Sequence, residues 1–153
     1  MQVTSSAFDE GGMIPTQCTA DGKNVSPSLA WSGAPATTKS LALICDDPDA
    51  PRAQAWVHWV LFNLPPDKHE LSEAIGQDET LADGARQGKN DFNKIGYGGP
   101  SPPRGPAHRY FFKVYALDTL LDLKPGATKQ QVESAMKGHV LAKGELMGKY
   151  GRS

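Results

Sequence analysis

Two short apolar runs in the first half of the chain predict buried β-strands. Residues 40–45 are almost continuously apolar and stop at the aspartates and prolines of residues 46–51, a composition that ends a strand in a turn fixed by proline. Residues 56–63 carry apolar side chains on both sets of alternate positions, as a strand inside a two-layer structure requires. His58 lies in the middle of the second run, so we expect its side chain to be largely buried.

A third strand is predicted at residues 109–117, where the two faces of the segment differ. His108, Tyr110 and the apolar residues that follow share one face, whereas Arg109 and Lys113 point the other way. The preceding residues 95–106 hold four glycines and four prolines, a composition that continues neither a helix nor a central strand. We therefore expect a shaped loop that leads into a strand carrying His108 and Tyr110 on its core side.

Helix signals are weaker and gather late in the chain. Residues 70–79 and 141–148 are each expected to hold a short helix, and residues 128–131 resemble a capping box that opens a helix ending near Gly138. The first 35 residues are rich in turn formers, which favours loops and short strands. Because no repeat or linker interrupts the chain, the sequence predicts one mainly β domain over residues 1–153, with a few short peripheral helices.

Composition and charge argue against several classes of function. The 153 residues carry a formal net charge of −1 without a long run of like charge, so no nucleic-acid partner is expected. No run of about 18 apolar residues occurs, and residues 1–10 lack the basic and apolar regions of an export signal. We therefore expect a cytoplasmic protein without a transmembrane segment, in which Cys18 and Cys45 are free thiols.

Polar side chains occur where the pattern predicts a core. Asp47 follows the first apolar strand in register with its core-facing positions, so its carboxylate can lean toward the same face. An ionised carboxylate beside an apolar core is costly unless it is paired. A histidine on a neighbouring strand, either His58 or His108, is the natural partner. Together with the phenol of Tyr110, these residues predict a polar pocket at the edge of the core.

Several short motifs follow one another in a specific order. They are Asn24-Val25-Ser26-Pro27, Leu29-Ala30-Trp31, Asp46-Asp47-Pro48-Asp49-Ala50-Pro51, Trp56-Val57-His58-Trp59, Asn63-Leu64-Pro65, Gly98-Gly99-Pro100-Ser101-Pro102-Pro103 and His108-Arg109-Tyr110. In this order and spacing they resemble the phosphatidylethanolamine-binding protein family, also known as the Raf kinase inhibitor protein family, and its bacterial and archaeal members in particular. The resemblance spans nearly the whole chain and implies two antiparallel β-sheets packed face to face as a β-sandwich.

The resemblance also implies a small pocket that takes phosphate, phosphorylethanolamine or a similar anion. Motif positions carry the ligand-binding role to Asp47, Asp49, His58, Pro102, His108 and Tyr110. Mammalian members end in a longer helical segment beside the pocket, whereas this sequence stops at Ser153. Tyr150 is a candidate to cover the pocket in its place.

Three classes of function are compatible with these residues. The leading expectation is a binding or regulatory module without a cofactor, with anion donors from His58, Tyr110 and the backbone N–H groups of residues 98–103. The family's reputation implies a kinase or a protease as a protein partner. The alternative is a hydrolase, although Ser101 lacks a nucleophile-elbow sequence, or a metal-dependent enzyme using Asp47 and the two histidines, although no dense ligand spacing occurs.

Two carboxylates beside an anion site need compensation for their charge. Either Asp47 holds a protonated histidine next to the anion, or a carboxylate receives the ammonium of a zwitterionic ligand such as phosphorylethanolamine. We expect the first arrangement for Asp47, because its register directs it toward the histidine strands. The second remains open for Asp49.

Overall fold

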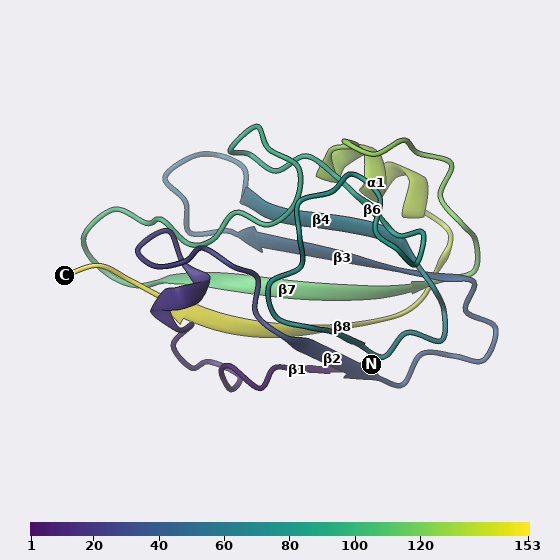
Figure 1. The fold of residues 1–153 in the computed structure, drawn as a ribbon, viewed down its shortest axis with the longest axis horizontal. Coiled ribbons are helices and arrows are strands. Elements are labelled where there is room, and N and C mark those ends of the chain that lie inside the picture. The colour runs from purple at the N-terminus through teal and green to yellow at the C-terminus, as the bar shows by residue number, and fades with distance from the viewer.

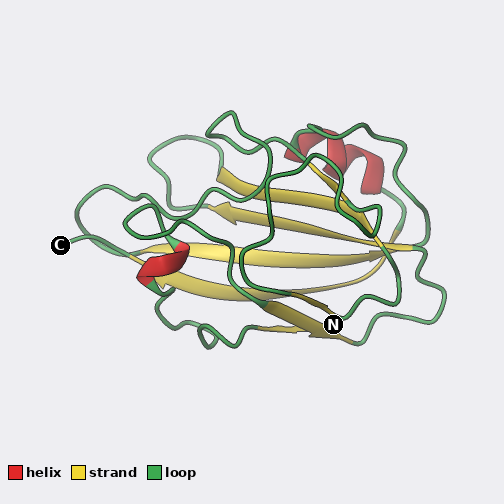
Figure 2. Cartoon of the chain, in the orientation of Figure 1, coloured by secondary structure: helices red, strands yellow, loops and turns green.

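Eight strands and two short helices make up the protein in the computed structural model, which describes residues 1–153. The strands are β1 (Gln2–Thr4), β2 (Leu29–Ser32), β3 (Ser40–Asp47), β4 (Trp56–Leu64), β5 (Glu70–Leu71), β6 (Arg86–Gln87), β7 (His108–Leu117) and β8 (Val140–Tyr150). The helices are a 3₁₀ turn, η1 (Thr16–Cys18), and α1 (Lys129–Met136). The mainly β fold expected from the sequence is confirmed (Figure 2).

Two antiparallel sheets form the framework (Figure 1). The smaller sheet has three strands in the order β1-β2-β5, and the larger has five in the order β6-β4-β3-β7-β8. The central strand β3 is buried on both faces: Leu41, Leu43 and Cys45 belong to the core shared with the smaller sheet, whereas Ala42 and Ile44 pack in a second core with α1. Burial on both faces explains why this strand reads as a continuous apolar run.

Helix α1 covers the outer face of the larger sheet near β4 (Figure 1). Its predicted capping box is confirmed, because the Thr128 hydroxyl accepts from the Gln131 N–H and the Gln131 side chain accepts from the Thr128 N–H. Val132 and Met136 are the buried residues of the helix. No helix in the structure has the length and apolar character needed to cross a bilayer.

The helix expected at residues 70–79 is wrong. Only the two-residue strand β5 forms there, and the chain then turns against Ser26, whose backbone carbonyl and hydroxyl accept from the N–H groups of Ala74 and Ile75. Ala74 has a φ of 64°, a left-handed conformation that a helix interior does not contain. Tertiary hydrogen bonds to Ser26 therefore determine the conformation of this segment.

The helix expected at residues 141–148 is also wrong, because this segment forms most of β8. The strand pairs with β7 from Val140 to Tyr150, and its glycines lie where other parts of the chain approach closely. A Cβ atom at Gly144 would meet the Met1 carbonyl oxygen at 2.3 Å, and one at Gly148 would meet the Phe8 ring at 2.6 Å. The glycines thus serve the packing of the N-terminal segment on this strand.

The two cysteines are buried and unpaired, so the expected free thiols are confirmed. Burial is the main cause that raises the pKa of the Cys18 thiol to about 11, and burial also raises the pKa of the Cys45 thiol. Both side chains are therefore protonated at neutral pH and behave as small apolar groups of the core.

Candidate functional site

The ends of four neighbouring strands meet at one end of the larger sheet. Asp47 at the end of β3 pairs with Trp56 at the start of β4, and His108 at the start of β7 pairs with Tyr150 at the end of β8. In Figure 1 these ends lie on the left, beside the C-terminus. Because successive antiparallel strands alternate in direction, motifs far apart in the sequence are brought together here.

A pocket of about 410 Å³ opens at this end of the sheet. Its polar lining residues are Asp47, His58, Ser101, His108, Tyr110 and Arg152, and its other lining residues are Ala50, Pro51, Trp56, Phe92, Pro102 and Pro103. Five of the six residues that the sequence assigned to a ligand site therefore share one pocket. The sixth, Asp49, is not part of the lining.

Asp47 orients His108 and has no free carboxylate oxygen. Its Oδ2 atom accepts from the His108 Nδ1 at 2.7 Å, and its Oδ1 atom accepts from the Asp49 N–H at 2.7 Å. The expected aspartate–histidine pair is present, with His108 and not His58 as the partner. With Nδ1 committed to Asp47, the second ring nitrogen of His108, Nε2, has no hydrogen-bond partner within the chain.

His58 is held by the glycine- and proline-rich loop. The residue is only 3% exposed, as its mid-strand position predicted, and its Nδ1 lies 2.6 Å from the Gly98 carbonyl oxygen. The ring packs edge-on against Phe92 and Tyr110, with centroid distances of 5.5 Å and 5.1 Å. Burial is the main cause that lowers the pKa of His58 below its ordinary 6.5, so the ring is neutral at neutral pH.

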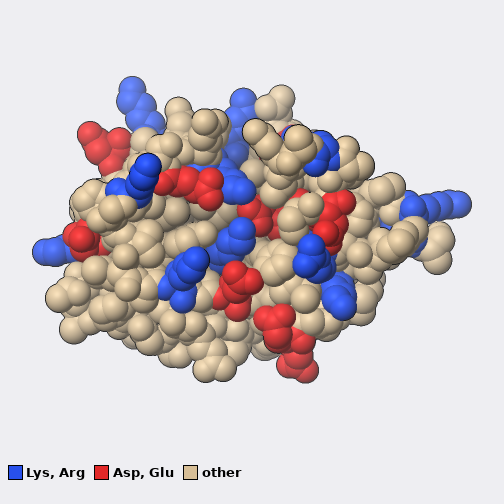
Figure 3. Space-filling model, turned by 180° about the vertical axis from the view of Figure 1, so that it is seen from behind, with Lys and Arg blue, Asp and Glu red and all other residues tan.

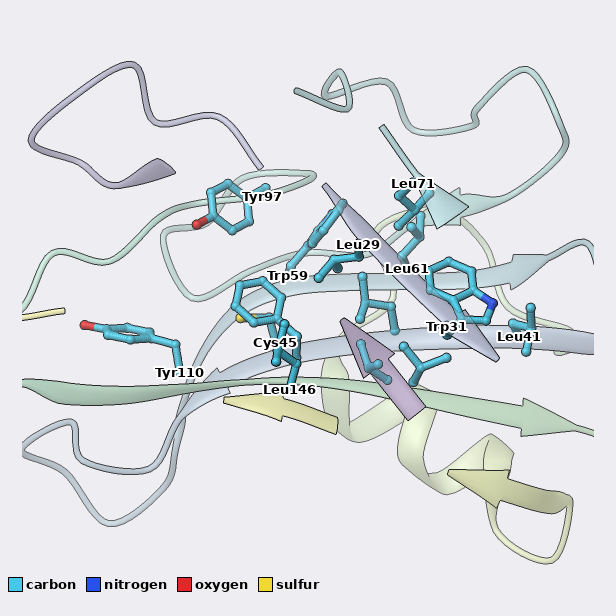
Figure 4. Close-up of a cluster of buried hydrophobic side chains, with 14 of the residues drawn as sticks. Leu29, Trp31, Leu41, Cys45, Trp59, Leu61, Leu71, Tyr97, Tyr110 and Leu146 are labelled. Atoms are coloured by element: carbon cyan, nitrogen blue, oxygen red, sulfur yellow. The ribbon is translucent and has the colours of Figure 1, made fainter. Parts of the chain in front are cut away.

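Tyr110 stands at the border between the core and the pocket. Figure 4 shows it at one end of the buried cluster, with its hydroxyl directed away from the other side chains. Burial, together with the charge of Asp47, raises the pKa of the phenol well above its ordinary value. The hydroxyl therefore keeps its proton and is a donor at any physiological pH.

The free polar atoms of these side chains are open to the pocket. The Trp56 indole nitrogen is the single buried side-chain nitrogen or oxygen that lacks a hydrogen-bond partner. The Nε2 atoms of His58 and His108 and the hydroxyl of Tyr110 also lack partners in the chain, yet they are not among the buried unpaired atoms. They are therefore reached from the pocket that their side chains line.

The chain matches the family model for phosphatidylethanolamine-binding protein over residues 4–151. The protein belongs to the phosphatidylethanolamine-binding protein family. It is 54% identical to a UPF0098 protein of Methanothermobacter thermautotrophicus, over 99% of each chain. Among solved structures it resembles a putative phosphatidylethanolamine-binding protein homologue of Chlamydia trachomatis (42% identity, TM-score 0.90, 99% and 97% coverage). It also resembles the family member YbcL of Escherichia coli (37% identity, TM-score 0.93, 99% and 98% coverage).

Arg152 and, on the apolar wall, Phe92 are pocket residues of this family member that the sequence pattern did not indicate. The Arg152 guanidinium donates to Asp21 from Nε (3.0 Å) and from a terminal nitrogen (2.7 Å), and to the Pro102 carbonyl at 2.9 Å. The hydrogen bonds from Arg152 are the largest cause that lowers the pKa of Asp21. The Tyr150 hydroxyl also donates to Asp21, at 2.6 Å, and Tyr150 does not line the pocket. Arg152, rather than Tyr150, therefore borders the pocket.

Asp49 and the loop backbone play a supporting part in this phosphatidylethanolamine-binding protein. Both oxygens of Asp49 accept from the Arg109 guanidinium, at 2.9 Å each, and these hydrogen bonds are the main cause that lowers the pKa of Asp49. The N–H groups of Gly98 and Gly99 donate to the His58 carbonyl and to the Asn24 side chain. The expectation that these two N–H groups bind an anion is therefore wrong, since both are already paired.

The arrangement can hold a small polar ligand without a metal. No group of three or more histidine, cysteine or acidic side chains is placed to hold a metal ion. What the pocket offers is a phenolic donor, a guanidinium and two imidazole Nε2 atoms. These are groups that bind oxyanions, or other ligands that combine donors with acceptors.

Proposed function

We propose that this protein binds a phosphate-bearing ligand in the pocket, in a binding or regulatory role and without catalysis. The observation that carries the proposal is the convergence of four groups on one small cavity: the Tyr110 hydroxyl, the Nε2 atoms of His58 and His108, and the Arg152 guanidinium. The arginine supplies positive charge and the phenol supplies a neutral donor. Asp47, whose oxygens are both paired, acts by orienting His108.

The rim of the pocket supports a ligand larger than a bare ion. Pro51, Trp56, Phe92 and Pro103 form apolar wall beside the polar groups, and Phe92 is 37% exposed. An apolar or aromatic substituent on a phosphate ester would cover this surface and remove it from water. A phosphomonoester is therefore a better match to the cavity than a fully polar solute.

Binding without turnover is supported by the surroundings of Ser101, whose aliphatic hydroxyl lines the pocket. Its Oγ atom lies 3.4 Å from a nitrogen of Arg152. A guanidinium has no acceptor and is not deprotonated in proteins, so it cannot act as a general base. We expect no turnover of phosphomonoesters or carboxylic esters. Assays with millimolar substrate that stay at the background rate would exclude the hydrolase alternative.

Replacing Tyr110 by phenylalanine tests the proposal, because it removes one hydroxyl and little else. Titration calorimetry of the wild-type protein with inorganic phosphate should show saturable binding. Tyr110→Phe should weaken it by about 1.5–3 kcal/mol, the range for a hydrogen bond to a charged group. Tyr115→Phe is the matched control, because Tyr115 lies on the same strand and lines no part of this pocket.

The control variant should bind phosphate as the wild type does. Absence of any saturable phosphate binding by the wild-type protein, or equal affinities of the Tyr110→Phe and wild-type proteins, would show that the pocket is not an oxyanion site.

A further inference from the structure

The hydrogen bond between His58 and the loop fixes which ring nitrogen carries the hydrogen. The Gly98 carbonyl oxygen lies 2.6 Å from Nδ1 and can only accept, so Nδ1 is the donor. In a neutral imidazole the other nitrogen then has a lone pair and no hydrogen. His58 thus presents Nε2 to the pocket as an acceptor, which is the opposite of what a fully deprotonated oxyanion requires.

The surroundings keep this ring neutral. The charges of Asp46 and Asp47 on β3 and of Asp91 in the loop after β6 act on this ring. His108 and Tyr110 on β7 and Arg152 near the C-terminus line the same pocket. The three aspartates favour a proton on the ring, but burial opposes it, outweighs them and lowers the pKa. A bound anion would, like the aspartates, favour a proton on the ring. An anion that carries its own hydrogen can instead donate it to the neutral ring, so the buried ring stays uncharged.

His108 differs from His58 in one respect that matters for an anion. Its Nδ1 donates to the carboxylate of Asp47 at 2.7 Å, and a carboxylate can balance the charge of a protonated ring. The Nδ1 of His58 has only a neutral carbonyl as its partner. Tyr110 and Arg152 are therefore the donors of the pocket, and His58, whose ring has no carboxylate partner to balance a charge, is its acceptor.

A ligand that suits this set needs both acceptor oxygens and one hydrogen of its own. We propose that the pocket selects an oxyanion carrying a P–OH group, either hydrogen phosphate or the monoprotonated form of a phosphomonoester, with the P–OH donating to His58 Nε2. Sulfate and phosphodiesters lack this hydrogen, so their oxygens would face a lone pair. This inference rests on the proposed function and specifies which oxyanions the proposed site prefers.

Inorganic phosphate and sulfate form the first pair of probes, because at pH about 7.5 they have similar shape and charge. Calorimetry of the wild-type protein should show phosphate binding about tenfold to a hundredfold more tightly, the equivalent of one hydrogen bond to a charged group. Equal affinities for phosphate and sulfate would overturn the selection while leaving an oxyanion site in place. Absence of binding by phosphate, sulfate and methyl phosphate alike would overturn the proposed function and this inference together.

Methyl phosphate and dimethyl phosphate form the second pair and separate an ester from the free ion. Methyl phosphate should bind near pH 5.5 and weaken as the pH rises through its second pKa of about 6, where it loses its hydrogen. Dimethyl phosphate should bind far more weakly at every pH. Binding of inorganic phosphate alone would assign the free ion, whereas dimethyl phosphate binding as tightly as methyl phosphate would contradict the inference.

The variant His58→Gln reverses the character of the group at this position, because a side-chain amide can turn its NH₂ toward the pocket. The ratio of phosphate to sulfate affinity should fall toward one. His139→Gln is the matched control, since His139 also donates through Nδ1, to Asp118, but lies outside the pocket. A folded His58→Gln protein that keeps the full wild-type ratio of phosphate to sulfate affinity would show that His58 does not accept the P–OH hydrogen. If the variant does not fold, the inference is tested by the anion comparisons on the wild-type protein.

Discussion

Arg152 brings positive charge to the pocket although its guanidinium is already paired with the carboxylate of Asp21. The bidentate pair with Asp21 fixes the guanidinium beside Ser101 and Pro102, so little conformational freedom is lost when an anion arrives. Arg152→Gln should weaken phosphate binding severalfold. The loss should shrink at high salt, because the interaction of exposed charges is screened.

Arg109 offers a matched control for this experiment. It forms the same kind of bidentate pair, with Asp49, but does not line the pocket. Arg109→Gln should therefore leave the phosphate affinity nearly unchanged. Equal losses in the two variants would mean that general charge, and not the position of Arg152, determines the affinity.

The residues of the site differ in how visible they are in the sequence. Asp47, His58 and Tyr110 could be predicted because strand periodicity fixes their faces, and the pairing of Asp47 follows from the cost of burying a lone carboxylate. Arg152 follows β8, a segment that was expected to be a helix, and its partner Asp21 lies in the irregular N-terminal region. Neither belongs to a periodic pattern, so only the three-dimensional arrangement brings them together.

At the scale of elements, one buried carboxylate links α1 to the larger sheet. Asp46 on β3 is almost fully buried and receives Lys113 from β7 and Lys129 from α1, at 3.1 Å and 2.7 Å. Asp46→Asn should lower the free energy of unfolding by about 2–3 kcal/mol, somewhat less than for a fully buried pair, because water reaches both lysines. Urea unfolding measures this loss.

A surface pair provides the comparison for Asp46. Asp83 accepts from Lys68 at 2.6 Å in a more exposed setting, where such pairs contribute about 0–1 kcal/mol. Asp83→Asn should therefore cost clearly less than Asp46→Asn. Similar losses in both variants would contradict the role assigned to the buried carboxylate.

The strand β8 forms where the local sequence favours a helix. Leu141, Glu145 and Met147 are residue types that favour a helix, but Gly144 lies inside the segment and costs about 0.5–1 kcal/mol in a helix. Pairing with β7 along its whole length supplies more hydrogen bonds than a short isolated helix would. Tertiary pairing therefore overrides the local preference for a helix, and the glycine inside the segment is the sequence feature that argues against that helix.

At the scale of the whole molecule, binding selectivity is a local property. The net charge is −1, and positive and negative side chains are interspersed on the face shown in Figure 3. No single-sign field over this face would draw anions toward the protein from a distance. We infer that selection rests on the few groups inside the pocket, which come from the strands β3, β4 and β7, the loops between strands and Arg152 near the C-terminus.

The stability of the whole molecule should depend on pH through His58. Burial lowers the pKa of this histidine in the folded protein, whereas in the unfolded chain it returns to about 6.5. Between these two values the unfolded state binds the extra proton. The free energy of unfolding should therefore fall as the pH drops below about 6.5, by at most about 1.4 kcal/mol per pH unit for one proton.

The carboxylates act in a different pH range, which makes the contribution of His58 separable. Asp21, Asp49 and Asp83 have folded-state pKa values below their ordinary 3.8, so their stabilisation is complete above that value and is lost only in stronger acid.

Urea unfolding of wild type and His58→Asn at pH 7.5, 6.5, 5.5 and 5.0, in buffers without phosphate, isolates the contribution of the histidine to stability. Asparagine retains a donor for the Gly98 carbonyl but cannot take up a proton. The wild-type protein should lose stability relative to this variant as the pH falls. A difference between wild type and His58→Asn that stays constant across the series would show that the buried ring is not kept neutral by the fold.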